Sequence, residues 1–490
     1  MNNLSCSLEE NLAELKAHTG GSADIVVRRA EVGGIAAAIV TVEGMVSSDA
    51  AALFVTQPLN AIKSPQTSER LFDTLSTKLF FGLEQTEPSN IREVATYAMS
   101  GFAVVLIDGI GKGIGVGVQG FSHRGVDQAL TDLNLRSSRE SFTEVIRTNM
   151  SLLRRRLKTP SLVMELMPLG TEVKTEVCLA YLSDKADENF IKDVKGRLSR
   201  IKTGLILESG FIQPFLEEKT STLFSEVGYT ERPDSLAAKI FEGRIAILVD
   251  GTPFALYLPK LFSENFQTMD DYSGQSLFMS MSRLLKYLAF IFTIMLPGFY
   301  CALANFHAEL FPNKLLFTLV SSISSTPYPV LLECVIIHLA YEVMREAGLR
   351  MPVYAGAAVS IVGGLVIGQI VVSAGLVGAP MILIVAVAAI SSFVVPDLYD
   401  TVILLRFAFL FAGGLFGLYG MIVLGIMVLM KIFSMEVYGF PFTAPMSPLT
   451  LGAMRDAFVR VCWRILGKPS ANINDMYGVS AGVGNGDVEN

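Results

Sequence analysis

Acidic side chains in apolar sequence are the first candidates for chemistry in this 490-residue chain. Glu333 and Glu342 both lie in the largely apolar stretch 315–344. A carboxylate inside a bilayer is costly unless it is paired or hydrated, so each is a candidate for ion handling or gating. Structural interpretations remain open beside this one. Either Glu342 or Glu346 pairs with Arg345, and Glu333 lies at a lipid headgroup.

The other reactive side chains of this region indicate structure rather than catalysis. His338 and Glu342 have the i, i+4 spacing of two helical metal ligands, but two ligands do not make a site. Asp397, Asp400 and Arg406 are expected to form a set of ion pairs at the membrane interface. The five cysteines are far apart and never form a C-x-x-C pair: Cys6, Cys178, Cys301, Cys334 and Cys462. We therefore expect no metal, no cofactor and no disulfide framework.

An uncharged polar stripe is a second candidate site. Gln369 and Ser373 are four residues apart on one side of an expected helix over 354–377. A polar stripe without charge suits the wall of a pore, because ions must bind weakly enough to leave. Roughly 100° away around the helix, small residues form a face suited to close helix packing: Ser360, Gly364 and Gly368. We hypothesise that this helix lines a conduction path.

Three consecutive arginines end an expected helix in the first half of the chain. Ser141 and Glu144 have the S-x-x-E spacing of a capping box, which predicts a helix from there to Leu157. The arginines Arg154, Arg155 and Arg156 then close it favourably against the helix dipole. Two interpretations remain open: a solvated helix end, or an anionic contact with a neighbouring subunit or lipid headgroups.

The distribution of charge divides the chain into two halves. Only 17% of the residues are charged, against roughly 25% in an ordinary soluble domain. Residues 1–275 hold 28 Lys and Arg and 35 Asp and Glu, whereas residues 276–490 hold 11 of each. No basic stripe is longer than three residues, which excludes a nucleic-acid binder. The chain has no H-E-x-x-H and no paired Cys and His, so we expect no enzyme.

Four apolar segments in the second half are expected to span a membrane: 284–304, 354–377, 380–399 and 407–430. Residues 351–396 carry no charge over 46 positions, enough for two crossings of ~20 residues. The stretch 315–344 is broken by prolines and charges, so it is either re-entrant or makes two short crossings. Four and six crossings both remain open. Arg283, Lys286 and the basic residues of the tail, 436–490, place both ends in the cytoplasm.

The first half alternates between strand-like and helix-like segments. We expect two soluble lobes, 1–135 and 136–275, before the transmembrane domain, 280–435. The expected elements are a glycine-bearing hairpin over 101–121, a strand at 171–182, a helix at 189–201, and strands at 244–249 and 254–258 around Asp250-Gly251. A phosphate loop at 111–113 is rejected, because no Ser or Thr follows its lysine. The first twenty residues lack an apolar signal-peptide core, so this half is expected to stay in the cytoplasm.

Long runs of residues in both halves carry a resemblance to a known family. They are 141–160, 229–259, 262–272, 306–312, 327–333, 341–352, 360–377, 392–397 and 438–450. Together, and in this order, they resemble the A subunit of bacterial spore germination receptors of the GerA type. The resemblance covers about residues 20–470. The sequence departs from the family pattern at 135–139, at Ser273, and at Val372-Ser373, where the family has Val-Glu.

The resemblance implies a non-enzymatic receptor subunit in the inner membrane of the spore. The family's A subunit is similar to an oligomeric ion channel, which is gated when a transporter-like B subunit binds a nutrient, and a lipoprotein C subunit completes the receptor. The implied fold is an α/β or α+β two-lobed cytoplasmic region followed by an α-helical polytopic membrane domain. Two alternatives remain: a secondary transporter that binds the nutrient in one chain, and a non-conducting scaffold. Against the transporter, the sequence offers no inverted repeat.

Overall fold

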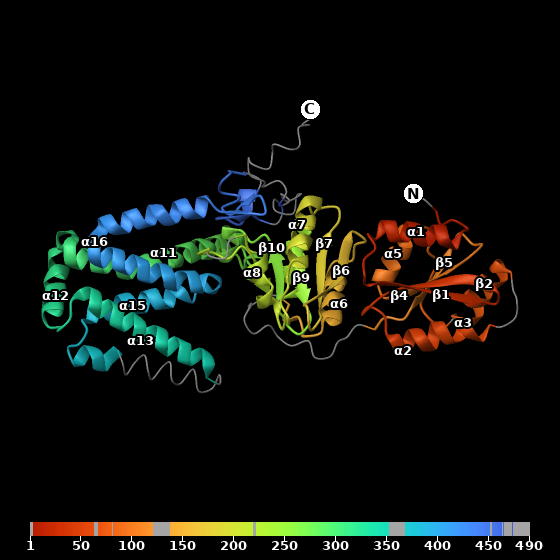
Figure 1. The fold of residues 1–490 in the computed structure, drawn as a ribbon, viewed down its shortest axis with the longest axis horizontal. Coiled ribbons are helices and arrows are strands. Elements are labelled where there is room, and N and C mark those ends of the chain that lie inside the picture. Colours follow the sequence, from red (N-terminus) through yellow and green to blue (C-terminus); the bar gives the residue numbers. More distant parts are fainter. Residues whose placement is uncertain are drawn as a thin grey trace, which may run out of the picture.

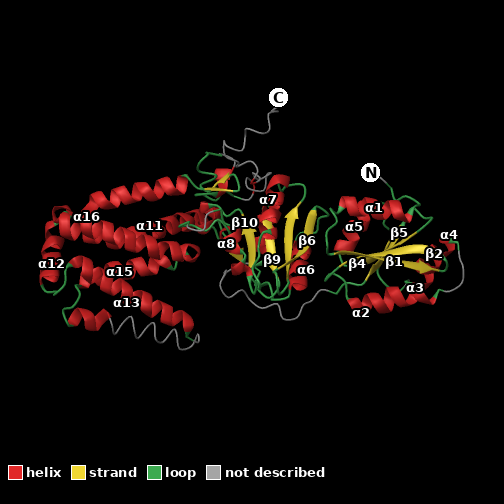
Figure 2. Ribbon diagram, viewed as in Figure 1, coloured by secondary structure: helices red, strands yellow, loops and turns green. Residues whose placement is uncertain are grey.

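The computed structural model places three parts in a row along the longest axis of the molecule (Figure 1). They are a first lobe of strands and helices, a second lobe of the same kind, and a region of helices only. The structure describes residues 3–62, 67–80, 82–120, 138–218, 222–351, 368–450, 453–462, 464 and 473. The predicted fold class, a two-lobed region of strands and helices before a helical region, is confirmed. Figure 2 shows that the strands are confined to the lobes and to a short hairpin beside the helical region.

The first lobe is an antiparallel sheet with helices on both faces. Its strands have the order β1-β2-β4-β5-β3 and are β1 (Ile25–Val32), β2 (Ile35–Val42), β3 (Gln85–Thr86), β4 (Phe102–Ile107) and β5 (Gly113–Gly117). Because side chains alternate across a strand, Val40 packs with α1 (Leu8–His18) and α5 (Ile91–Met99), whereas Ile39 faces the other layer. That layer holds α2 (Ser48–Ala51), η1 (Ala52–Thr56), α3 (Gln57–Ala61), α4 (Ser68–Thr74) and η2 (Leu75–Leu79). The hairpin predicted over 101–121 is confirmed as β4 and β5.

The second lobe has the same layered construction. Its strands have the order β6-β7-β9-β10-β8 and are β6 (Leu162–Leu169), β7 (Thr175–Leu182), β8 (Gly228–Thr230), β9 (Ile245–Val249) and β10 (Ala255–Leu258). Its helices are α6 (Ile146–Arg156), α7 (Glu188–Ser199), η3 (Ser209–Phe211), α8 (Gln213–Leu216) and α9 (Pro233–Phe241). Helices α6 and α9 cover one face of the sheet, and α7 and α8 cover the other. The predicted strands at 171–182, 244–249 and 254–258 and the helix at 189–201 are confirmed within a few residues at each end.

The two lobes are two copies of one topology. Each runs helix, strand, strand, helices, strand, helix, strand, strand, and the five strands have the same order in both sheets. The hydrogen bonds at the start of each lobe repeat as well. Asp108 Oδ1 accepts from Leu8 N at 2.9 Å, and Asp250 Oδ1 accepts from Ile146 N at 3.0 Å. Each aspartate follows a central strand and satisfies a free N–H group at the start of its lobe's first helix.

The repeated aspartate also corrects the predicted capping box. The helix begins at Ile146 rather than just after Ser141, and Ser141 Oγ donates to Glu231 O at 3.1 Å instead of capping it. The N-terminal turn is capped across the lobe by Asp250. A sequence motif reports only local partners, so it missed a cap that comes from about a hundred residues away.

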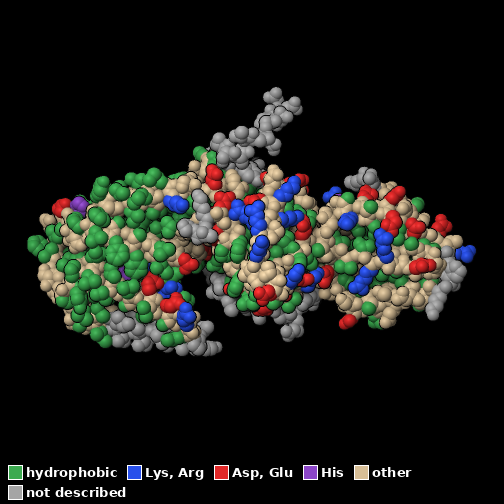
Figure 3. All heavy atoms as spheres, in the orientation of Figure 1, with side chains coloured by type: hydrophobic (Ala, Val, Ile, Leu, Met, Phe, Trp, Pro, Cys, Tyr) green, Lys and Arg blue, Asp and Glu red, His purple; other side chains and the backbone are tan. Residues whose placement is uncertain are grey.

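The helical region contains α11 (Ser276–Phe306), α12 (Asn313–Ser324), α13 (Val330–Arg350), the end of a helix at 368–373, α15 (Ala379–Ser392) and α16 (Tyr399–Phe433). Among the described residues, α11 and the stretch Pro396–Phe433 are long and apolar enough to cross a membrane. In Figure 3 hydrophobic side chains dominate this region, and charged ones gather on the lobes. Helices α11 and α16 meet backbone to backbone, because a Cβ atom at Gly298 would clash with Phe409 O and one at Gly413 with Gly298 O.

Helix α16 is broken at Gly417, within the span expected over 407–430. Gly417 has φ 63° and ψ −153°, a conformation open almost exclusively to glycine. Beyond it the chain turns back on itself: a Cβ atom at Gly420 would lie 2.7 Å from Ala412 O. The weaker stretch 315–344 forms α12 and most of α13, separated by a turn that ends at Pro329.

The chain after α16 returns to the second lobe. The hairpin of β11 (Glu436–Val437) and β12 (Phe440–Pro441) places Phe440 and Phe442 in the same core as α7. Tyr438 OH donates to Leu216 O at 2.7 Å, and its ring meets that of Phe190 edge to face. The second lobe, α11 and α16 therefore share one continuous core.

Candidate functional site

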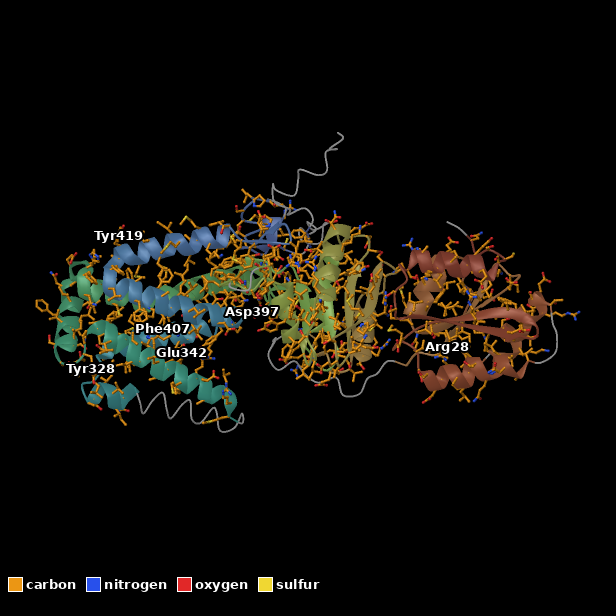
Figure 4. All side chains as sticks on the ribbon, viewed as in Figure 1. Arg28, Tyr328, Glu342, Asp397, Phe407 and Tyr419 are labelled. Carbon is orange, nitrogen blue, oxygen red and sulfur yellow. The ribbon has the colours of Figure 1, made fainter. Side chains whose placement is uncertain are left out.

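A buried charge cluster in the helical region joins α13 to α16. Glu342 Oε1 lies 3.0 Å from Arg406 Nη1, and the Arg406 side chain is almost completely buried. Arg406 Nε also donates to Thr293 O of α11 at 3.3 Å. Glu342 points inward from α13 (Figure 4), so the pair connects three helices. A buried guanidinium needs such a carboxylate, since an unpaired charge there would be very costly.

The second carboxylate oxygen of Glu342 binds the end of α13 and the start of α16. Glu342 Oε2 accepts from Arg345 Nε at 3.1 Å and from Tyr399 OH at 2.5 Å. The guanidinium of Arg345 also lies 3.8 Å from the centre of the Tyr399 ring. The structural interpretation of Glu342 as a partner of Arg345 is thereby confirmed. The site is larger than that pair, because Arg406 completes it from a helix 64 residues away.

Arg406 does not form the predicted set of ion pairs with Asp397 and Asp400. Asp397 Oδ2 lies 3.6 Å from Lys260 Nζ of the second lobe, and Asp400 is exposed. The prediction was wrong because Asp400 precedes Arg406 by six residues on a helix and therefore lies on another side of it. Figure 4 shows Asp397 at the end of the helical region nearest the second lobe.

His338 is a core histidine. Its Nδ1 atom lies 2.9 Å from Cys334 O, one turn earlier in α13, and its ring meets that of Phe407 edge to face. Glu342, the second member of the metal-like pair, is occupied by Arg406 and Arg345. Within the described ranges no group of three or more His, Cys, Asp or Glu side chains is arranged to hold a metal ion.

Glu333 joins the first turn of α13 to the start of α15. It is 2% exposed, and its Oε1 atom accepts a hydrogen bond from Gly378 N, the residue that caps α15. A carboxylate at a helix N-terminus is favoured by the free N–H groups and by the helix dipole. Glu333 is therefore buried against a protein partner, and it does not take the alternative position at a lipid headgroup.

The stripe of Gln369 and Ser373 lies on the described end of a helix at 368–373. Both side chains are exposed, and Ser373 Oγ donates to Ile370 O of the preceding turn at 3.0 Å. Of the predicted packing face, Gly368 lies near α15, where a Cβ atom would meet Ile382 Cγ2 at 4.0 Å. Ser360 and Gly364 lie outside the described residues.

Arg154 lies between the two lobes, which excludes both interpretations drawn from its position at a helix end. Its side chain is fully buried, and Nε and Nη2 lie 2.6 Å and 2.8 Å from the two carboxylate oxygens of Asp24. Nη2 also donates to Leu162 O at 2.9 Å and Nη1 to Thr159 O at 3.0 Å. The residue was expected at the surface because a run of three arginines resembles a solvated end. A buried acceptor from another lobe gives no local sequence signal.

Arg155 and Arg156 remain partly exposed and share one carboxylate. Both bind Glu140, with Arg156 Nη2 2.8 Å from Glu140 Oε2 and 2.8 Å from Ser138 Oγ. Partial burial raises the pKa of Glu140, but the hydrogen bonds and charges of the two arginines outweigh this and hold the pKa below its ordinary value.

A second buried charge cluster, missed by the sequence analysis, lies where the second lobe meets α11. Arg283 is fully buried, with Nε 3.0 Å from Asp271 Oδ2 and Nη1 2.9 Å from Asp456 Oδ1. Tyr272 OH donates to the other Asp456 oxygen at 2.6 Å. The sequence marked Arg283 only as a sign of orientation. The cluster ties together the segment before α11, α11 itself and the tail.

Comparison of the sequence with known proteins identifies the family of this chain. The sequence profile described as "Bacillus/Clostridium GerA spore germination protein" matches residues 13–471. The chain belongs to the GerA family. Spore germination protein KA of Bacillus subtilis (strain 168) is 36% identical over 465 residues, which cover 94% of this chain and 85% of that protein. Spore germination protein B1 of the same organism is 32% identical over 458 residues, covering 93% of this chain and 94% of that protein.

Two further proteins are similar to this GerA-family chain: one is named as a membrane protein, and the other is a solved N-terminal domain. The uncharacterized membrane protein YfkQ of Bacillus subtilis (strain 168) is 36% identical over 463 residues, or 94% of this chain and 90% of that protein. The crystal structure of the N-terminal domain of the A subunit of the Bacillus megaterium spore germinant receptor GerK3 is 35% identical. It covers 53% of this chain and 98% of that one, with a TM-score of 0.44.

Family membership confirms the resemblance seen in the sequence. This GerA-family chain is a subunit of the spore germination receptor type, it is a membrane protein, and it is not an enzyme. The buried ion pairs described above hold the helices and the lobes of this receptor subunit together.

Proposed function

We propose that this GerA-family protein is the membrane subunit of a nutrient-responsive germinant receptor and forms an oligomeric, ligand-gated cation channel that releases ions from the spore core. The exposed positions of Gln369 and Ser373 carry the proposal. They lie in a stretch of 46 residues without charge, on the outside of the helical region. Exposed polar groups are unfavourable against lipid, and a water-filled path enclosed by several copies removes that cost.

The proposed orientation has both the lobes and the tail on the cytoplasmic side of the inner spore membrane. Its support is the return of the chain to the second lobe after α16, where Phe440 and Phe442 enter the lobe's core. A chain whose two ends share one core crosses the bilayer an even number of times. The buried pair of Glu342 and Arg406 is then a fixed joint of the membrane domain rather than part of an aqueous path.

The proposed partners are those implied by the family: a transporter-like B subunit that binds the nutrient, a lipoprotein C subunit, and further copies of this chain. The match to the GerA family over nearly the whole chain supports this assignment. Arg155 and Arg156 remain the proposed contact with a neighbouring subunit or lipid headgroups, because each side chain is still about one-third exposed. Arg154 is no longer part of this proposal.

Ion flux through the reconstituted full chain tests the channel. Liposomes loaded with a cation-sensitive dye receive the wild-type chain, the Gln369→Leu variant, the Ser373→Ala variant and the double variant. We expect flux to fall in the single variants and most in the double one, since each removes part of the polar wall. Leu376→Ala is the matched control, as Leu376 is exposed near the same helix end but apolar. Unchanged flux in the double variant would contradict the proposed pore wall.

The mass of the detergent-purified chain, corrected for bound detergent, tests the assembly. A pore on a symmetry axis needs a closed ring of several copies. A monomer that persists in lipid nanodiscs would contradict the channel. A ring that conducts no ions with the companion subunits and nutrient present would instead identify a scaffold.

A further inference from the structure

Two buried cysteines of the helical region lie against each other. Cys301 belongs to α11 and Cys334 to α13, and both side chains are completely buried. Their thiols hydrogen-bond each other. Cys301 Sγ also lies 4.0 Å from Val330 O, which is one turn before Cys334 on the same helix. The two helices therefore face each other at this point through a pair of sulfur atoms.

A histidine on α13 contacts one of the two sulfur atoms. His338 Nδ1 lies 2.9 Å from Cys334 O and 3.5 Å from Cys334 Sγ. A carbonyl oxygen only accepts hydrogen bonds, so Nδ1 carries the proton and shares it between the carbonyl and the sulfur. A donor beside a sulfur stabilises the negative charge that forms there when the thiol reacts. Cys334 is therefore the nucleophile of the pair, and Cys301 is the second thiol within its reach.

The surroundings of the pair decide which reagents reach it. Both cysteines belong to the apolar core that α11, α12, α13, α15 and α16 build together. Large or charged thiol reagents such as glutathione do not enter such a core, whereas a peroxide is small and neutral. Buried thiols react slowly, so we expect oxidation over hours. For the same reason, soluble thiols do not readily reverse it.

We propose that Cys301 and Cys334 form a redox site, which a peroxide converts into a disulfide between α11 and α13. First the Cys334 sulfur attacks the peroxide: an S–O bond forms, the O–O bond breaks, and the thiol proton leaves in the released water. Then the Cys301 sulfur attacks Cys334 Sγ: the S–S bond forms, the S–O bond breaks, and a second water carries away the Cys301 proton. The two thiols together lose one electron pair, and hydrogen peroxide takes it up.

The disulfide would fix α13 on α11 beside the joints described above. Helix α13 carries Glu342, which binds Arg406, and Glu333, which binds the residue that caps α15. In the reduced chain only packing holds α13 on α11 at the two cysteines, whereas in the oxidised chain a covalent bond does. The redox site is independent of ion conduction and of the number of copies, because both thiols belong to a single chain.

Peroxide treatment of the detergent-purified full chain tests the site. The background carries Cys6→Ser and Cys462→Ser, because these two cysteines are exposed and would react first. After treatment the chain is unfolded, the remaining thiols are alkylated, and the digest is read by mass spectrometry. We expect peptides linked through Cys301 and Cys334, which dithiothreitol separates again. Cys178, buried in the sheet of the second lobe, is the matched control and should remain a free thiol.

Thermal unfolding of the same samples gives a second readout. A link between α11 and α13 restricts the unfolded chain, so oxidation should raise the unfolding temperature by about 5 °C. The Cys301→Ala variant lacks the second thiol and should show neither the linked peptides nor the rise in temperature.

Absence of the linked peptides overturns the inference in either of two ways. Met381 belongs to the same core as the two cysteines, so its conversion to the sulfoxide reports that the peroxide has reached them. Free thiols beside an oxidised Met381 would show that the two sulfur atoms are not placed to react. Free thiols beside an intact Met381 would show that the core excludes the oxidant. A disulfide that links either cysteine to a second chain would also contradict a site within one chain.

Discussion

The guanidinium of Arg154 and the carboxylate of Asp24 form a buried two-bond ion pair that joins the two lobes. Nε and Nη2 bind one carboxylate oxygen each, at 2.6 Å and 2.8 Å. Beside the pair, Ala23 N donates to Met164 O and Met164 N to Ser22 Oγ, both at 2.8 Å. The segment of Ser22 to Asp24 thus docks on the edge of β6, and Arg154 fixes it there.

Arg154→Ala is expected to loosen this docking by about 3–5 kcal/mol, because it leaves Asp24 buried and unpaired. Hydrogen exchange of the full chain, read at the amides of Ala23 and Met164, measures the effect as faster exchange. The neighbouring variant Arg155→Ala is the control. It removes a partly exposed pair with Glu140, which is worth ~0–1 kcal/mol, and should leave both amides protected. Equal effects of the two variants would contradict the assigned role of Arg154.

The aspartates Asp108 and Asp250 are expected to have equal and additive effects on stability. Each accepts from the first helical N–H group of its own lobe, so Asp108→Ala and Asp250→Ala should each cost about 1 kcal/mol. The two sites lie in separate lobes, and their effects should add. Exchange protection of α1 and α6 is the measurement, and the Asn variants, which keep an acceptor oxygen, are the controls. A clear effect in one lobe alone would contradict the repeat of this contact.

The elements of both lobes could be predicted from local patterns. The Asp250-Gly251 turn between apolar runs identified β9 and β10, and the glycine-bearing run at 101–121 identified β4 and β5. What the patterns could not reveal was the repeat itself. It resides in strand order and in contacts such as Asp108 with Leu8, which join residues 100 positions apart. Hydrophobic periodicity carries no information on either.

The candidate site was predictable by residue type but not by partner. Glu342 stood out as a carboxylate in apolar sequence, and its bond to Arg345 followed from their spacing. Its bond to Arg406 did not, because packing of α13 against α16 decides it. The break at Gly417 was also hidden. Glycine is common in membrane helices, and a backbone conformation is not visible in the composition of an apolar stretch.

Glu226→Gln is expected to stabilise the chain at neutral pH. Glu226 is 2% exposed, and burial, together with the nearby charges of Glu218 and Glu217, raises its pKa above the ordinary value of 4.5, although the bond from Glu218 N opposes this. The ionised form is therefore disfavoured in the folded state. That cost is complete above the folded pKa and disappears as the pH falls below 4.5.

Thermal unfolding of the full chain at a series of pH values measures this difference. The variant should unfold at a higher temperature than wild type at pH 7, and the two curves should converge near pH 4. The exposed residue Glu172 provides the control, since Glu172→Gln should change neither curve. A variant that is less stable than wild type at neutral pH would show that the carboxylate of Glu226 has a partner that an amide cannot replace.

Gly417→Ala is expected to destabilise the helical region by about 1–3 kcal/mol, because the φ of 63° and ψ of −153° exclude a side chain. The added methyl group would also approach the Phe306 side chain to 3.2 Å. Gly425→Ala is the control in the same helix: its Cβ atom would meet only Phe409 Cε1, at 4.0 Å, and helix propensity then favours alanine. The unfolding temperature of the detergent-solubilised chain distinguishes them. Equal temperatures would mean that α16 continues straight through Gly417, and a straight α16 of 35 residues would move its last turns away from Phe440 and the second lobe.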